Sequence, residues 1–196
     1  MTTIKFGDKI ENKIIEIYES QDFFLLGIDS GELELTFDLK AENINVNIYG
    51  LVLGKDKKSF KLRTKTIHSV KNASSWVLLK GIFAGQSTFD FEGMISIAEG
   101  ASGSDAYLQN ENLLLSDEAI VNSSPQLEIC NDDVKASHGV TISTIDDLQA
   151  FYLKSRGLDA KTTDEVLIKG FASEVINKLT EIESESIPEI NGYFRS

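Results

Sequence analysis

Four side chains that could do chemistry lie within one short stretch, LEICNDDVKASHGVT, at residues 127–141. Cys130 precedes the acidic pair Asp132 and Asp133, and His138 follows them. A thiolate and an imidazole can ligate a metal ion, while a carboxylate beside an imidazole could act with it as acid and base. A buried strand that follows a polar turn would contain the same residue types. A metal site, a catalytic base and a structural strand are therefore three open interpretations.

Each of these residues also fits a purely structural role. Asn and Asp accept backbone donors in tight turns, which favours a solvated turn for Asp132 and Asp133 over an acid–base pair. In an extended segment His138 shares a face with Val140, so the residues alone favour a buried, hydrogen-bonded histidine. One cysteine cannot supply the four protein ligands that iron–sulfur clusters usually need. The other histidine, His68, has no ligand-like neighbour in sequence and is expected to be a polar residue at a strand end.

The elements that must position these residues are short strands, because alternation of apolar and polar side chains dominates residues 13–143. The alternation is clearest in ELELTFDL, at residues 32–39. Clusters of Gly, Ser, Asn and Asp separate similar runs, and Gly50, Gly81 and Gly93 form a weak repeat that we interpret as corners. Many short strands with glycine corners fit either a β-sandwich or a β-solenoid. The periodicity does not decide between these two folds.

Two helices are expected after residue 143, where the period changes. Thr144 followed by Asp147 resembles a capping arrangement, which predicts a helix over residues 145–156. Thr162 with Glu165 resembles a second cap and predicts a longer amphipathic helix. Its apolar stripe consists of Ile168, Phe171, Ala172, Val175 and Leu179. The acidic tail at residues 183–196 is expected to be mobile.

The composition limits the classes of partner. With 19 Lys and Arg against 31 Asp and Glu, the formal net charge is −12, which argues against nucleic acid and anionic membranes as main partners. A single cysteine excludes an internal disulfide, and neither a signal-like N-terminus nor an apolar run of membrane-spanning length occurs. These features predict a cytoplasmic protein.

A resemblance to a known family rests on residues 110–158, and above all on the segments PQLEI, DDVK, SHG and FYLKSRG. These segments resemble the SufB/SufD family of the SUF iron–sulfur cluster assembly system, and within it the SufD type. The similarity extends weakly back to about Thr66, whereas residues 1–60 match nothing familiar. The resemblance implies a right-handed parallel β-helix, here residues 1–143, followed by a helical segment at residues 144–182. It thereby favours the solenoid over the sandwich.

The resemblance also implies a role for His138. SufB-type members carry a cysteine and a glutamate at the positions of Asn110 and Gly139, so this chain resembles the SufD type. SufD-type members contribute a histidine at the position of His138, which we therefore expect at a shared cluster-assembly interface. Cys130 has no usual counterpart in the family and is an improbable ligand. We expect no stably bound cofactor in the isolated chain, and a transient iron–sulfur cluster only at a shared interface.

The implied function is a non-enzymatic scaffold that pairs with a SufB-type protein or with a second copy of itself. A SufC-type ATPase is expected to dock on the helical region, with Lys169, Phe171 and Glu174 as candidate contacts. Two rivals stay open: a β-solenoid hydrolase or lyase that uses His138 with Asp132 or Asp133, and an interaction module without iron chemistry. An enzyme needs these side chains to converge in an open pocket, whereas a scaffold needs His138 at a pairing edge.

Overall fold

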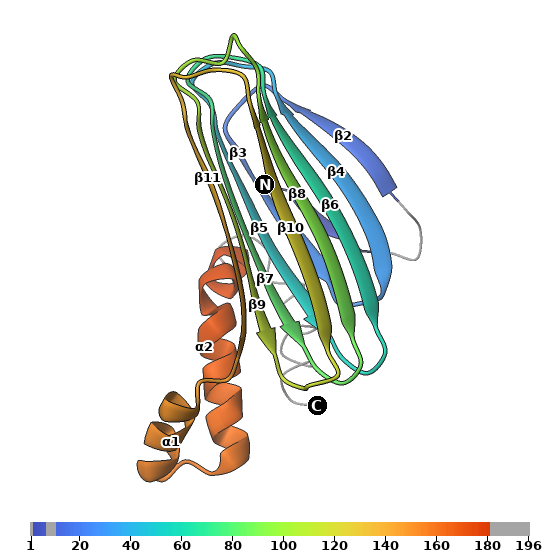
Figure 1. Ribbon diagram of the computed structural model, residues 1–196, viewed down its shortest axis with the longest axis vertical. Coiled ribbons are helices and arrows are strands. Elements are labelled where there is room, and N and C mark those ends of the chain that lie inside the picture. The colour runs from blue at the N-terminus through green and yellow to red at the C-terminus, as the bar shows by residue number, and fades with distance from the viewer. Residues whose placement is uncertain (1, 7–10, 181–196) are drawn as a thin grey trace.

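The computed structural model describes residues 2–6 and 11–180 of the 196-residue chain. The expected tail at residues 183–196 lies outside the described residues. Within the described part, a series of strands is followed by two helices (Figure 1). The elements are β1 Thr2–Lys5, β2 Glu11–Ile17, β3 Gln21–Gly27, β4 Gly31–Leu39, β5 Asn45–Gly54, β6 Ser59–His68, β7 Ser74–Phe83, β8 Thr88–Ile97, β9 Asp105–Leu114, β10 Ile120–Ile129, β11 Lys135–Thr144, α1 Asp147–Ser155 and α2 Ala160–Thr180.

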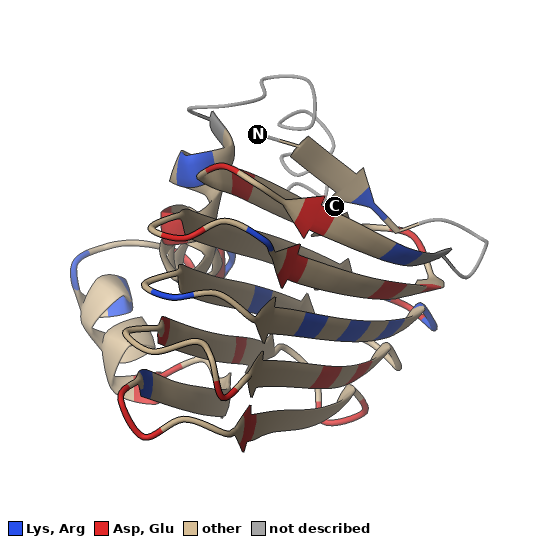
Figure 2. Ribbon diagram, turned by 90° about the horizontal axis from the view of Figure 1, so that it is seen from above, with Lys and Arg blue, Asp and Glu red and all other residues tan. Residues whose placement is uncertain are grey.

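Successive strands alternate between two sheets. The first sheet has the order β1-β3-β5-β7-β9-β11 and the second the order β10-β8-β6-β4-β2, and neighbouring strands pair in parallel. Each coil therefore contributes one strand to each sheet, and the coils stack along one axis (Figure 2). This arrangement confirms the β-solenoid and excludes a sandwich of antiparallel sheets.

The repeat of the solenoid is visible in its pairing register. Ser74 pairs with Asn45 in the coil before it and with Asp105 in the coil after it, so one coil spans about 30 residues. At one corner, Asn43, Asn72 and Gly103 have φ angles of 61°, 54° and 75°. Asn and Gly tolerate this left-handed conformation better than other residues. These positions mark one corner of the coil.

The three repeated glycines are not corners, contrary to our expectation. Gly50, Gly81 and Gly93 lie within strands and face the narrow interior between the sheets. A Cβ at Gly50 would overlap the side chain of Leu79, and a Cβ at Gly81 would overlap the ring of Phe83. Glycine is required at these positions because large apolar neighbours occupy the space that a side chain would need.

The core follows the predicted alternation. In β4, the inward-facing members of the ELELTFDL segment are buried and their polar neighbours lie outside. Edge-to-face and stacked phenylalanine pairs continue the core from coil to coil, for example Phe60 with Phe83 and Phe83 with Phe89. Burial of these apolar faces between two sheets positions every strand of the solenoid.

On the outer face of the second sheet, basic side chains of β6 lie beside acidic side chains of β4 and β8, so opposite charges neutralise each other from strand to strand. Lys61 of β6 lies between Glu32 and Asp90, and Arg63 approaches Glu92 of β8 at 3.3 Å. Figure 2 shows this basic strand between strands that carry Asp and Glu. Opposite charges in register support strand pairing and leave little net positive surface for phosphate groups.

The helix boundaries differ from the expected caps. Asp146, not Thr144, caps α1, because its Oδ1 accepts hydrogen bonds from the backbone N–H groups of Leu148 (2.8 Å) and Gln149 (3.0 Å). Thr144 stays extended because it still pairs with β9. Likewise, Asp159 Oδ1 accepts from Thr162 N at 2.7 Å, and this backbone hydrogen bond lowers the pKa of Asp159.

α2 packs on the outer face of the first sheet (Figure 1). Ala172, Val175 and Leu179 are fully buried against apolar residues of β3, β5 and β7, such as Leu51 and Leu78. The predicted stripe is therefore real, but most of it covers the flat face of the sheet. Val175 and Leu179 of the stripe are therefore not available to a docking partner. Within the described residues, neither helix is both long and apolar enough to cross a membrane.

Candidate functional site

His138 lies on β11, the outermost strand of the first sheet (Figure 1). Its register partner is Leu108 of β9, so its side chain points to the interior side of the coil. It is nevertheless exposed, because β11 has a paired neighbour on one side only in the described chain. The interpretation of His138 as a buried structural histidine is wrong for this chain.

The last coil exposes an apolar edge. We use the term terminal-coil edge for Ile120 and Ile129 of β10 together with His138, Val140 and Ile142 of β11, all of which are exposed. β10 and β11 are the outermost strands of their sheets, so each presents backbone N–H and C=O groups that a further strand could pair. Unpaired strand edges flanked by exposed large apolar side chains are typical of surfaces that another chain covers.

The acidic pair forms a turn rather than a catalytic dyad. Asp133 accepts a hydrogen bond from the Ser102 hydroxyl, and its backbone N–H donates to Asn131 Oδ1 at 2.8 Å. Asp132 and Asp133 line a 260 Å³ hollow with Lys135, and His138 is not among its lining residues. In the described part of the chain, His138 makes no hydrogen bond to either aspartate. The geometry gives no support to the hydrolase or lyase hypothesis.

Cys130 is an exposed residue that directly follows β10. Its backbone N–H donates to the Ile97 carbonyl at 2.9 Å and continues the strand pairing for one more residue. Among the described residues, no three His, Cys, Asp or Glu side chains are close enough to hold a metal ion together. The described chain by itself therefore offers His138 and Cys130 as isolated potential ligands.

His68 has a structural role in the interior. It ends β6, is fully buried, and places Nε2 2.8 Å from the Ser75 hydroxyl. Burial lowers its pKa to about 4, although the Ala73 backbone and the charge of Asp105 act in the opposite direction. The sequence predicts its place at a strand end correctly, but its burial was not foreseen.

Asn110 also faces the interior, where it is buried with Asn112. Its Nδ2 donates to the Leu79 carbonyl at 3.3 Å, and its Oδ1 accepts from Asn112 Nδ2 at 2.7 Å and from the Ser123 hydroxyl at 2.8 Å. These contacts satisfy a polar group inside the coil. Asn110 thus joins β9 to β7 and β10, and it lies in register with Val140 of the terminal-coil edge.

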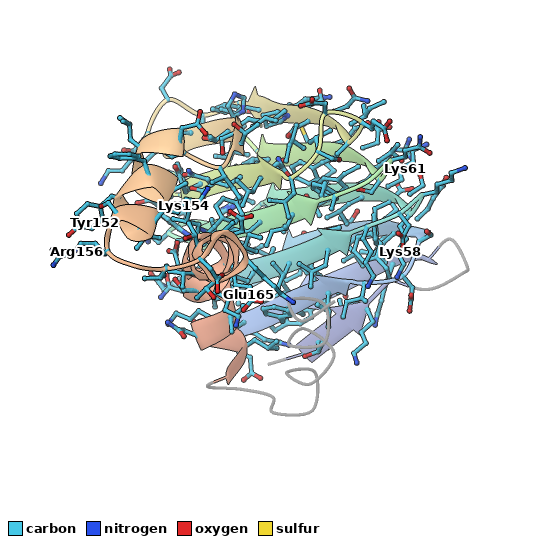
Figure 3. The ribbon with its side chains drawn as sticks, turned by 90° about the horizontal axis from the view of Figure 1, so that it is seen from below. Lys58, Lys61, Tyr152, Lys154, Arg156 and Glu165 are labelled. Carbon is cyan, nitrogen blue, oxygen red and sulfur yellow. The ribbon has the colours of Figure 1, made fainter. Side chains whose placement is uncertain are left out.

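A second candidate surface is the groove between α1 and α2. Its volume is 840 Å³, and Leu113, Tyr152, Val166 and Phe171 contribute to its walls. On α1, Leu148, Phe151 and Tyr152 are exposed, so the apolar face predicted for this helix is real and uncovered. Figure 3 shows Tyr152 and Arg156 projecting outward together from α1, and the Arg156 guanidinium lies 5.9 Å from the Tyr152 ring centre.

The three predicted docking residues have different environments. Lys169 is half exposed on α2, with Glu165 3.9 Å away. Phe171 is partly buried, and Glu174 Oε2 lies 3.4 Å from Nζ of the buried Lys80 on β7. Glu174 therefore already has a partner within the chain. Sequence reasoning missed Lys80, although a lone lysine within the apolar segment WVLLKGIF was a usable signal.

Comparison with known proteins identifies relatives across most of the chain. The model for the family described as SUF system FeS cluster assembly, SufBD core domain, matches residues 24–171. SufD of Escherichia coli strain K12 is 36% identical over 156 residues, which cover 80% of this chain and 37% of the relative. SufD of Bacillus subtilis is 30% identical over 151 residues, covering 72% and 34%.

A cyanobacterial relative belongs to the same group. The Synechocystis SufBD family protein slr0074 is 31% identical over 141 residues, covering 72% of this chain and 29% of the relative. The chain thus spans roughly a third of the length of these curated relatives. The family match begins at residue 24. The resemblance recognised from short motifs extends back only to about residue 66, so the family model covers some forty residues more at the N-terminal side.

Proposed function

The chain belongs to the SufBD core family of iron–sulfur cluster assembly, and from this membership we propose that it is a non-enzymatic, SufD-type scaffold of the cytoplasm. The observation that carries the proposal is the terminal-coil edge, where two parallel strands each have one unpaired edge and where exposed apolar side chains accompany His138. A scaffold that assembles a cluster between two chains needs an edge of this kind. A folded enzyme would instead enclose its catalytic groups in a pocket.

The proposed partner at the terminal-coil edge is a SufB-type scaffold or a second copy of this chain. Strand addition at β10 and β11 would satisfy the edge backbone groups and cover Val140 and Ile142. A neutral imidazole at His138 can then ligate iron or orient a ligand of the partner. In this proposal the cluster is transient cargo, and Cys130 is a strand-end residue without a ligand role.

The proposed second partner is a SufC-type ATPase that docks on the groove between α1 and α2. The groove is apolar, opens to solvent and has the exposed side chains of Leu148 and Phe151 beside it. Lys169 supplies a positive charge on the exposed side of α2. Glu174 is a weaker candidate for a direct contact because it pairs with Lys80.

Pairing can be tested with two matched substitutions on strand edges. Ile142 is 46% exposed on β11, and Ile14 is 67% exposed on β2, the outermost strand of the second sheet at the other end of the solenoid. Size-exclusion chromatography with light scattering, with and without the cognate SufB-type protein, should show that Ile142→Lys abolishes assembly and Ile14→Lys does not. If Ile14→Lys abolishes assembly and Ile142→Lys does not, the interface lies at the N-terminal end of the solenoid.

ATPase docking is tested by a pull-down with the cognate SufC-type protein. Lys169→Glu and Leu148→Ser should weaken binding, because both residues are exposed on the helical region. Lys57→Glu, an exposed lysine in the turn before β6, is the control for charge. Binding that survives both helical substitutions would exclude this surface. Loss of binding in the control as well would show that charge alone, and not this groove, governs the interaction.

A further inference from the structure

A buried lysine links α2 to the solenoid. Lys80 lies on the outer face of β7 with only 9% of its side chain exposed. Its Nζ is 2.9 Å from Glu111 Oε2 on β9 and 3.4 Å from Glu174 Oε2 on α2, and it lies 5.0 Å from the ring centre of Phe171. The ammonium group is therefore shared between the sheet and the helix.

The contacts of Glu111 continue along β9. Its second oxygen, Oε1, accepts a hydrogen bond from Gln109 Nε2 at 2.7 Å, and Gln109 Oε1 accepts one from the Tyr107 hydroxyl. The Tyr107 ring lies against Trp76, with 4.4 Å between ring centres. Lys80, Glu111, Gln109 and Tyr107 thus form one continuous row of polar contacts, which we call the Lys80 row.

The Lys80 row ends beside the strand that carries His138. In the register of β9 with β11, Tyr107 lies opposite Ser137 and Gln109 lies opposite Gly139. A Cβ at Gly139 would be 3.9 Å from both the Tyr107 hydroxyl and Gln109 Oε1, so these polar groups border the Gly139 backbone. His138 is the residue between these two positions.

We propose that the Lys80 row couples the packing of α2 against the first sheet to the stability of the edge strand β11. When α2 moves, Glu174 leaves the shared ammonium, and Glu111 must compensate for a charge that has little access to water. Glu111 Oε2 already lies 2.9 Å from Lys80 Nζ. A rotation of the carboxylate that brings Oε1 to the ammonium as well therefore takes Oε1 away from Gln109 Nε2, and Gln109 in turn holds Tyr107 beside β11. The residues of the row act by positioning and contact no cluster themselves.

The inference deepens the proposed function, because a partner that docks on the helices would then influence the strand edge that carries His138. Coupling of this kind is reciprocal, so a partner at β11 would also change the seating of α2. Coupling between α2 and β11 is established by substitutions rather than by contacts alone. It is present when the effects of two substitutions in the row on β11 are non-additive.

The test is amide hydrogen exchange of the isolated chain, followed by mass spectrometry. Glu174→Gln keeps the shape of the side chain and removes its charge, and it should accelerate exchange of the β11 amides at least threefold. In a chain that already carries Gln109→Met, the same substitution should leave β11 unchanged. Glu165→Gln, whose partner Lys169 lies on the surface of α2, is the matched control and should leave β11 unchanged.

Two outcomes would overturn the inference. If Glu174→Gln accelerates exchange in α2 but not in β11, Lys80 is only an anchor for the helix. If its effect on β11 persists undiminished with Gln109→Met, the coupling bypasses the row. Because no partner is present in this experiment, a failure of ATPase docking in the pull-down would refute the proposed docking and leave this result intact.

Discussion

Removing Glu111 should destabilise the protein more than removing Lys80, although the two groups belong to the same ion pair. Glu111→Leu leaves an ammonium that is 9% exposed, with Glu174 as its remaining carboxylate at 3.4 Å. Leaving a fully buried charge without any partner costs about 3–5 kcal/mol, and since Glu174 stays within reach we expect a loss of about 2 kcal/mol.

The opposite substitution leaves groups that reach water more easily. Lys80→Met keeps the apolar stem under α2, and the carboxylates that lose their partner are 24% and 63% exposed. Solvation of these carboxylates should limit the loss to about 1 kcal/mol. Urea unfolding, monitored by circular dichroism at pH 7, gives both free energies, and the exposed Lys169→Met should change the value by less than about 0.5 kcal/mol. A larger loss for Lys80→Met than for Glu111→Leu would refute the reasoning.

Three further predictions concern the interior and the first helix cap. Gly81→Ala should cost about 1–3 kcal/mol by overpacking, whereas Gly100→Ala, which has open space around it, should be nearly neutral in thermal unfolding. Because the pKa of His68 falls from 6.5 to about 4 on folding, the unfolded chain binds a proton between these pH values that the folded chain does not. Stability should therefore fall by about 3 kcal/mol from pH 6.5 to pH 4, and His68→Asn should remove this part of the slope while His138→Asn should not. Asp146→Ala should cost about 1 kcal/mol and increase hydrogen exchange in the first turn of α1.

Much of the fold could be predicted from local patterns, because alternation places apolar residues on one face of each strand whatever the neighbouring strands are. The choice between sandwich and solenoid depends on which strands pair. In this chain each strand pairs with the strand about 30 residues away, and this repeat distance distinguishes the solenoid. Asn43, Asn72 and Gly103 carry this spacing in the sequence. Local pattern does not show which large side chains cross the interior, so it does not distinguish glycines that make room for such side chains from glycines at corners.

The candidate site was harder to predict because it depends on what lies next to each strand. The exposure of His138 follows from the position of β11 at the edge of the first sheet, which alternation within residues 134–141 does not reveal. Thr144 resembled a cap but is held extended by pairing with β9, so Asp146 takes the capping role. The partners of Lys80 are distant in sequence: the pairing of β7 with β9 places Glu111 opposite it, and the packing of α2 brings Glu174 to it.

The central claim is that this chain supports cluster assembly through His138 at a shared edge, and paired complementation tests it most directly. A strain that lacks its SufD-type scaffold would receive the wild-type chain, His138→Ala or Cys130→Ser together with the cognate SUF partners. The measured quantity is the activity of an iron–sulfur enzyme per unit of scaffold protein. We expect His138→Ala to lower this ratio severalfold with unchanged scaffold abundance, and Cys130→Ser to match the wild type. A wild-type ratio for His138→Ala, with the loss appearing in Cys130→Ser, would contradict the account.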